Sequence, residues 1–168
     1  YRNEILAEDL AEAPGALWKV ATLEKCRVFQ HPDLARVGVG VDPPGGATEC
    51  GIVGAGIALC SCKGAEQLHA FVVADKSLRA PPDVWAKEVV ACYNELEADR
   101  IYGEKNFGGD MVETTIKTVS RTVSYENVHA SRGKAIRAEP ISALYEQGRV
   151  HHVGQLQGLE AEMISWMP

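Results

Sequence analysis

The stretch Arg36-Val37-Gly38-Val39-Gly40-Val41 alternates valine with arginine or glycine. Because successive side chains of a β-strand point to opposite faces of the sheet, the three valines would share one face and the two glycines the other. A strong turn signal, Asp42-Pro43-Pro44-Gly45-Gly46, follows directly. The pattern therefore predicts a strand over residues 36–41, with Asp42 directly after it.

Two further strands are indicated next along the chain. Residues 49–59 are unusually rich in glycine, which indicates that another backbone packs closely against them. Gly64 marks a turn, and residues 68–73 form an apolar stretch that ends near Asp75. Three strands joined by tight turns predict an antiparallel meander.

Helices and strands alternate in the rest of the chain. We expect helices from Asp83 to Leu96, from about Gly108 to Thr118, over 139–147 and over 156–166, and short strands over 100–103 and 127–130. Residues 149–153 are expected to be a short extended piece. The sequence thus predicts an α/β fold: a mixed five-stranded central sheet, made of the meander plus parallel strands and flanked by helices. That order is typical of a ribonuclease-H-like domain.

Composition narrows the class of protein. The 168 residues fit one domain, and 46% hydrophobic with 24% charged residues exclude a disordered or collagen-like chain. No apolar run is long enough to span a membrane, and no signal peptide opens the chain, so we expect a soluble protein. Five cysteines, an odd number, indicate reduced thiols. Cys60-Ser61-Cys62 has one intervening residue and no second pair, which favours plain thiols over a metal site.

Charge is distributed unevenly along the chain. The net charge is −6, from 17 basic and 23 acidic residues. Residues 117–137 nevertheless carry five basic residues against one acidic residue, a net of +4. The chain therefore combines an acidic body with one basic segment.

Two carboxylates follow strands in the same way. Asp42 follows the first predicted strand and Glu104 follows the strand over 100–103. If these strands are parallel neighbours, they lie roughly 4.8 Å apart and bring the two acids together, with Lys105 the one obvious base between them. Two such acids repel each other unless a cation bridges them, and oxygen ligands suit Mg²⁺ or Mn²⁺. The alternative is that Asp42 caps a turn and Glu104 is a solvated strand end.

Asp75 is a third candidate. It should lie two strands, roughly 10 Å, from Asp42, too far to share a metal. It is therefore expected to form a turn with Ser77 or to support the metal ligands from beside them.

Several motifs resemble the nuclease domain of the large terminase subunit of tailed bacteriophages, over nearly the whole chain. They are Val39-Gly40-Val41-Asp42-Pro43, Asp75-Lys76-Ser77, Glu104-Lys105-Asn106-Phe107-Gly108-Gly109, Ala130-Ser131-Arg132-Gly133-Lys134, Arg137-Ala138-Glu139-Pro140, Glu146-Gln147-Gly148-Arg149-Val150 and Trp166-Met167-Pro168, with Pro14-Gly15-Ala16-Leu17-Trp18 before them.

The resemblance implies a ribonuclease-H-like endonuclease that cuts concatemeric viral DNA during genome packaging by two-metal hydrolysis with Mg²⁺ or Mn²⁺. It implies that Asp42 is shared by the metals and that Glu104 holds one of them. Asn106 would support these ligands, and Arg132, Lys134 and Arg137 would contact the backbone of double-stranded DNA.

The resemblance also implies a packaging ATPase domain, a small terminase subunit and a portal as partners, in the cytoplasm of the bacterial host. The family's third acid would lie beyond Pro168. We therefore expect a helical or linker segment over residues 1–34 and a nuclease domain over 35–168 with an incomplete C-terminus.

Three alternatives remain open at the level of sequence. One is another ribonuclease-H-like nuclease of the junction resolvase type. Another is a catalytically silent domain that docks onto the packaging motor. The third, half of a sugar-kinase or actin-like ATPase, would need a glycine-rich phosphate loop, which the sequence lacks.

Overall fold

The computed structural model describes residues 12–43, 49–104, 109–129 and 132–168. The first eleven residues of the segment expected over 1–34 lie outside the described residues, as do most of the turn after Asp42, Lys105 and Asn106. The strand predicted from the alternating valines is β2, Arg36–Asp42.

The predicted meander is confirmed. β2 pairs antiparallel with β3 (Gly51–Cys60), and β3 pairs antiparallel with β4 (Gln67–Asp75). β3 is glycine-rich where neighbours approach closely, as predicted: a Cβ on Gly56 would lie 2.8 Å from the backbone oxygen of Arg36.

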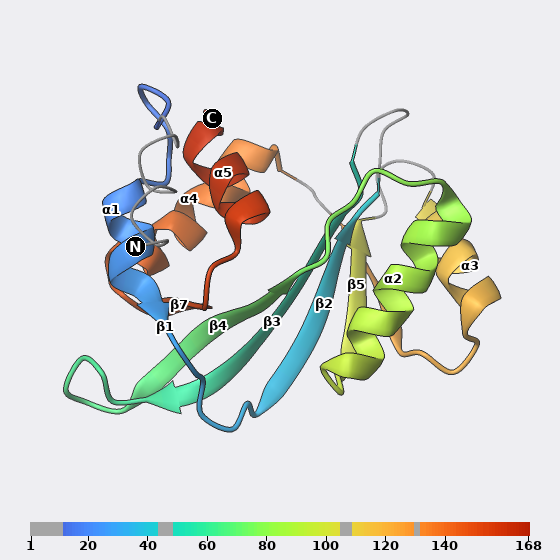
Figure 1. Ribbon diagram of the computed structural model, residues 1–168, viewed down its shortest axis with the longest axis horizontal. Helices are drawn as coiled ribbons and strands as arrows, with labels where there is room; N and C mark the ends of the chain where they lie inside the picture. Colours follow the sequence, from blue (N-terminus) through green and yellow to red (C-terminus); the bar gives the residue numbers. More distant parts are fainter. Residues whose placement is uncertain (1–11, 44–48, 105–108, 130–131) are drawn as a thin grey trace, which may run out of the picture.

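Parallel strands extend the meander on both sides. β5 (Arg100–Glu104) pairs with β2, and β6 (Tyr125–Val128) follows it. On the other side, β7 (Val150–Val153) pairs with β4, and β1 (Arg27–Val28) forms the edge. The order is β1-β7-β4-β3-β2-β5-β6 (Figure 1). The sheet therefore has seven strands rather than the expected five, because the extended piece after Arg149 finds partners on both sides.

Helices cover the sheet in two groups (Figure 1). α2 (Pro82–Glu95) and α3 (Gly109–Val119) lie together beside β2 and β5. α1 (Val20–Cys26), α4 (Lys134–Glu146) and α5 (Gln157–Ser165) gather near β7. Residues 20–28 of the segment expected to precede the domain thus contribute a helix and an edge strand to the fold. None of the described helices combines the length and the apolar character needed to cross a membrane.

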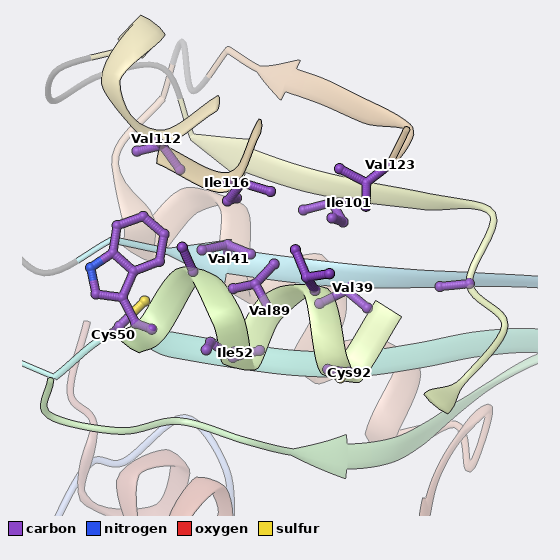
Figure 2. Packing of buried hydrophobic residues seen from close by; sticks show 14 residues of the cluster. Val39, Val41, Cys50, Ile52, Val89, Cys92, Ile101, Val112, Ile116 and Val123 are labelled. Carbon is purple, nitrogen blue, oxygen red and sulfur yellow. The ribbon is translucent and has the colours of Figure 1, made fainter. Parts of the chain in front are cut away.

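The valine face of β2 is buried in the larger core. Val39 and Val41 pack there with Ile52 of β3 and Ile101 of β5, under α2 and α3 (Figure 2). Burying a side chain of this size stabilises the fold by about 1.5–3 kcal/mol. This packing fixes β2 and β5 side by side and so sets the positions of the residues at their ends.

The smaller core lies on the α1, α4 and α5 side. It contains Leu23, Val72, Tyr145, Val150 and Ile164. It holds α4 and α5 against β4 and β7, which places the first turn of α4 near the end of β2.

Candidate active site

Asp42 and Glu104 end two neighbouring parallel strands. In the register of β2 and β5, Val41 lies opposite Gly103, and each acid is the next residue on its strand. The condition on which the sequence argument depended, that these strands are parallel neighbours, therefore holds. The two carboxylates reach the same edge of the sheet because parallel strands present the same end there.

The two acids line an open cleft of about 450 Å³ at this edge. The Asp42 side chain is 60% exposed, whereas that of Glu104 is 21% exposed. Gly51 faces Asp42 across the β2–β3 pair, and a Cβ there would come within 3.4 Å of the Asp42 Cβ. The glycine thus leaves the space beside the Asp42 carboxylate open.

α4 brings one base to each acid. Lys134 Nζ donates to Asp42 Oδ2 at 2.8 Å, and Arg137 Nη2 lies 3.4 Å from Glu104 Oε1. The bases are three residues apart and so share one face of the helix. The family resemblance implied DNA contacts for both bases, and their pairing with the acids was not predicted because the helix was expected to begin at residue 139, whereas α4 begins at Lys134.

The donor set at the cleft fits a divalent cation. Two carboxylates offer the hard oxygen ligands that Mg²⁺ and Mn²⁺ prefer. The Lys134–Asp42 pair is more than half exposed on both sides, and exposed pairs are worth only about 0–1 kcal/mol. A divalent ion therefore has to displace only a weak contact to reach Asp42.

Asp75 ends β4 at the same edge of the sheet but is separated from Asp42 by β3. Its Oδ1 accepts from the backbone N–H of Ser77 at 3.1 Å, which is the turn that the sequence indicated. Its Oδ2 accepts from the backbone N–H of Leu159 at 2.8 Å, in the first turn of α5. The carboxylate thus links β4 to α5; a supporting role toward the metal ligands stays a prediction.

Arg132 and Asn106 are the remaining residues predicted for the site. Arg132 is exposed and lies two residues before the start of α4, close in sequence to the cleft base Lys134. Asn106 lies outside the described residues, so its predicted role stays a prediction.

Glu162 of α5 is an acid near this edge that the sequence did not reveal. Burial raises the pKa of its carboxyl, and the negative charges of Glu49 and Asp75 raise it further. Acidic residues are common on the solvent face of helices, so nothing in the sequence separated Glu162 from that ordinary case.

Comparison with known proteins identifies the family and the fold of this chain. Residues 39–164 match the family described as the terminase RNaseH-like domain. No curated protein matches the chain in sequence.

Solved structures share the fold at low sequence identity. The large terminase of bacteriophage HK97 gives a TM-score of 0.57 at 12% identity, over 83% of this chain and 34% of that one. This chain thus spans about a third of the HK97 protein. The large terminase nuclease of thermophilic phage G20c with bound magnesium gives 0.53 at 12% identity, over 85% and 76% of the two chains.

A mutant nuclease domain of the large terminase subunit of bacterial virus Sf6, solved with manganese and beta-thujaplicinol, gives a TM-score of 0.54 at 12% identity. It covers 89% of this chain and 67% of its own. These structures establish the ribonuclease-H-like fold that the strand order predicted. With the family match over residues 39–164, they lead to one conclusion: the chain belongs to the terminase RNaseH-like domain family.

Proposed function

We propose that this chain is a divalent-metal-dependent endonuclease that cuts double-stranded viral DNA during genome packaging, by two-metal phosphodiester hydrolysis. The observation that carries the proposal is the convergence of Asp42 and Glu104 at the ends of β2 and β5, in an open cleft. Membership of the terminase family supports DNA as the substrate.

Asp42 would be a ligand shared by the two metals, and Glu104 would hold one of them. Mg²⁺ or Mn²⁺, when bound, supplies Lewis-acid stabilisation of the charge that develops on the phosphate and makes water a better nucleophile at neutral pH. The magnesium and manganese in the G20c and Sf6 structures support this choice of ions.

The bases of α4 would bind the phosphate backbone of the DNA. Lys134 and Arg137 lie where a phosphate must come to meet Asp42 and Glu104, so they can exchange a carboxylate partner for a phosphate partner. Arg132, exposed before the helix, would add a further backbone contact. Such contacts give affinity without reading the base sequence.

Family membership also supports partners for the whole protein. A packaging ATPase domain, a small terminase subunit and a portal would act with this domain in the cytoplasm of the bacterial host. The HK97 large terminase, of which this chain spans 34%, is the kind of longer protein in which the domain would work.

The test compares Asp42→Asn and Glu104→Gln with Asp83→Asn, whose acid is an exposed ion-pair partner of Lys87 on α2. With Mn²⁺ and supercoiled plasmid, the two cleft variants should lose more than about 100-fold in cleavage rate, beyond the roughly 10–100-fold typical of residues that only support metal ligands. Asp83→Asn should cut like the unmodified chain, and circular dichroism should show all three folded.

Retained cleavage by either cleft variant would falsify the assignment of the metal ligands. A strong preference for branched over linear duplex DNA would instead favour the junction resolvase alternative. Absence of Mn²⁺ binding in calorimetry by the unmodified chain would favour a silent docking domain.

A further inference from the structure

Four metal-binding side chains meet at the end of the sheet away from the cleft. They are Cys60, Cys62, His69 and His151, here called the Cys-His cluster, and one ligand atom of each lies within 4.8 Å of the other three. The β3–β4 hairpin loop that carries Cys62 lies at the lower end of these strands in Figure 1, whereas β2 ends at the upper end.

Distance separates this cluster from the nuclease cleft. Gly51, opposite Asp42, begins β3 and Cys60 ends it. Nine residues of extended strand span about 30 Å. A metal at the cluster would therefore be independent of one held by Asp42 and Glu104.

The fold brings the two histidines to one face of the sheet. Phe71 of β4 lies opposite His151 of β7, and His69 precedes Phe71 by two residues, so all three side chains share a face. The imidazoles stack with their centroids 5.2 Å apart. Both are buried, at 1% exposure for His69 and 6% for His151.

The hairpin loop brings the thiols to these rings. β3 ends at Cys60, and a turn closed by a hydrogen bond from the Gly64 N–H to the Ser61 carbonyl oxygen returns the chain to β4. Cys62 Sγ lies 3.6 Å from both His69 Nδ1 and His151 Nε2. The loop thus places a thiol over the pair of ring nitrogens.

The distances from Cys62 Sγ to the two ring nitrogens match edges of a tetrahedral zinc site. With Zn–S of about 2.3 Å and Zn–N of about 2.0–2.1 Å, tetrahedral geometry puts S and N about 3.6 Å apart and two N atoms about 3.3 Å apart. The two S–N distances are 3.6 Å and the N–N distance is 2.9 Å. To complete the tetrahedron, the rings would move apart by a few tenths of an ångström, and Cys60 Sγ, which lies within 4.8 Å of the other three ligand atoms, would move to the matching distances.

The hydrogen bonding of His151 leaves the coordinating nitrogen unprotonated. Its Nδ1 lies 3.2 Å from the backbone oxygen of Cys26, which can only accept, so Nδ1 carries the proton. In the neutral ring, the lone pair is then on Nε2, which faces His69 and Cys62. A backbone carbonyl that fixes the tautomer of a histidine is a common support of metal ligands.

The donor set selects the metal. Thiolate and imidazole ligands together suit Zn²⁺, and two thiolates with two neutral imidazoles balance its charge. Four protein ligands leave no open position, which is typical of a structural rather than a catalytic site.

Sequence spacing concealed this cluster. Cys60-Ser61-Cys62 lacks a second pair nearby, because the partners stand 7 and 89 residues after Cys62. Strand pairing, rather than a local motif, brings them together. Plain thiols at Cys60 and Cys62, which the sequence favours, are the alternative that the test below separates from a metal site.

We propose that the Cys-His cluster binds one Zn²⁺ ion, which fastens the β3–β4 hairpin loop to β4 and β7. The ion would stabilise the edge of the sheet far from the cleft. Since the two metal sites share no residue, this proposal stands or falls independently of the nuclease assignment.

The test measures zinc in the chain purified from zinc-supplemented cells and dialysed without chelator. Elemental analysis should find about one zinc per chain in the unmodified protein and in Asp42→Asn, which lacks a cleft ligand, but none in Cys62→Ser. Cys62 is exposed, so its replacement by serine should leave the fold intact. The Cys92→Ser variant, whose thiol lies in the larger core away from the cluster, should retain zinc.

Two further readouts follow the metal directly. Substitution with Co²⁺ should give the visible absorption of a tetrahedral thiolate complex in the unmodified chain and not in Cys62→Ser. A chelator should lower the melting temperature of the unmodified chain but not that of Cys62→Ser. The proposal is overturned by equal zinc contents in the two proteins, by a cobalt spectrum without thiolate bands, or by a Cys60–Cys62 disulfide found by alkylation and mass spectrometry.

Discussion

Lys134 Nζ lies 2.8 Å from Asp42 Oδ2, and one turn further along α4 Arg137 lies 3.4 Å from Glu104. One helix thus neutralises both acids of the cleft. A divalent ion and a DNA phosphate, arriving together, would exchange partners with these pairs: metal with carboxylates, and bases with phosphate. In the absence of DNA, the α4 bases would therefore compete with the metal for the two carboxylates. In its presence, the same bases would bind the DNA phosphates.

Competition predicts that Lys134→Ala binds Mn²⁺ more tightly than the unmodified chain when DNA is absent. An exposed ion pair is worth about 0.2–1 kcal/mol, which corresponds to a gain of about 1.5- to 5-fold in affinity. Isothermal titration calorimetry measures it. Lys134→Arg keeps the charge and should change the affinity little, as should Lys87→Ala on α2. A weaker affinity in Lys134→Ala would show that the lysine does not compete.

Removal of the same lysine, together with Arg132, should weaken DNA binding, whereas it strengthens metal binding. Replacing both Arg132 and Lys134 by alanine removes two proposed phosphate contacts, and each contact adds about 0.9 to the slope of log K against log salt. Fluorescence anisotropy with a duplex in EDTA should therefore show weaker binding and a slope smaller by about 1.8. Lys117 and Arg121, at the end of α3 and just after it, offer the matched double variant, which should keep the original slope. Equal slopes for the two double variants would remove the phosphate role.

The sequence predicted this site where its signals were local. The alternation around Val39 and the turn after Asp42 specified β2 and its end, and the same logic placed Glu104 at the end of β5. The neighbouring placement of β2 and β5 was a condition of the sequence argument, and the structure meets it. These features depend on the alternation of side chains along a strand and on turn-forming residues such as proline and glycine, both of which are visible in a single sequence.

The pairing of acids with bases could not be predicted in the same way. Pro140 favours a helix start near residue 139, because proline is common in the first turn of helices. In the structure α4 begins at Lys134 and contains Pro140. This earlier start puts Lys134 and Arg137 on the helix face toward the cleft.

β7 was concealed by its composition. His151 and His152 are both buried, one on each face of the sheet: His151 stacks on His69, while His152 bonds Tyr145. Two adjacent histidines look polar in a hydropathy pattern, so the sequence indicated only an extended piece. Tertiary partners on both sides, which no local pattern encodes, make it a strand.

Glu160 should be essential to stability. Arg27 binds it through two hydrogen bonds of 2.9 and 3.0 Å, and His152 Nδ1 lies 2.8 Å from it, with the Glu160 side chain 8% exposed. Glu160→Gln removes the charge that Arg27 and His152 bind and leaves Arg27 with Glu24 and the Gly154 carbonyl oxygen, which should cost about 1.5–3 kcal/mol of unfolding free energy in urea denaturation. Glu24→Gln removes the other acid bound to Arg27, but Glu24 is 59% exposed, so the loss should stay below about 1 kcal/mol. Equal losses of unfolding free energy in Glu160→Gln and Glu24→Gln would mean that burial does not decide how much each ion pair with Arg27 contributes.

Acid should destabilise the chain through the same carboxylate. Burial alone would raise the pKa of Glu160, but the hydrogen bonds from His152 and Arg27 outweigh it and hold the pKa at about 2, below its ordinary 4.5. A depressed pKa contributes stability that is fully present above about 4.5 and is lost as pH falls toward 2. At about 1.4 kcal/mol for each pH unit between the two pKa values, the stability lost is roughly 3 kcal/mol. Urea denaturation from pH 6 to 2 should show a shallower loss for Glu160→Gln than for the unmodified chain; parallel curves would contradict the role of this carboxylate.

Close packing in β3 supplies the last prediction. A Cβ on Gly56 would lie 2.7 Å from Leu34 Cδ1 and 2.8 Å from the Arg36 backbone oxygen, and β2–β3 pairing holds that oxygen in place. Gly56→Ala should therefore destabilise the chain by about 1–3 kcal/mol, as overpacking does.

Gly40→Ala is the matched control on the neighbouring strand, because its Cβ would meet nothing closer than the Val53 oxygen at 3.8 Å. It should be neutral or stabilising by up to about 1 kcal/mol, since alanine restricts the unfolded chain. Urea denaturation at neutral pH measures both variants. If Gly56→Ala were as stable as Gly40→Ala, the glycines of β3 would not owe their place to the close approach of β2.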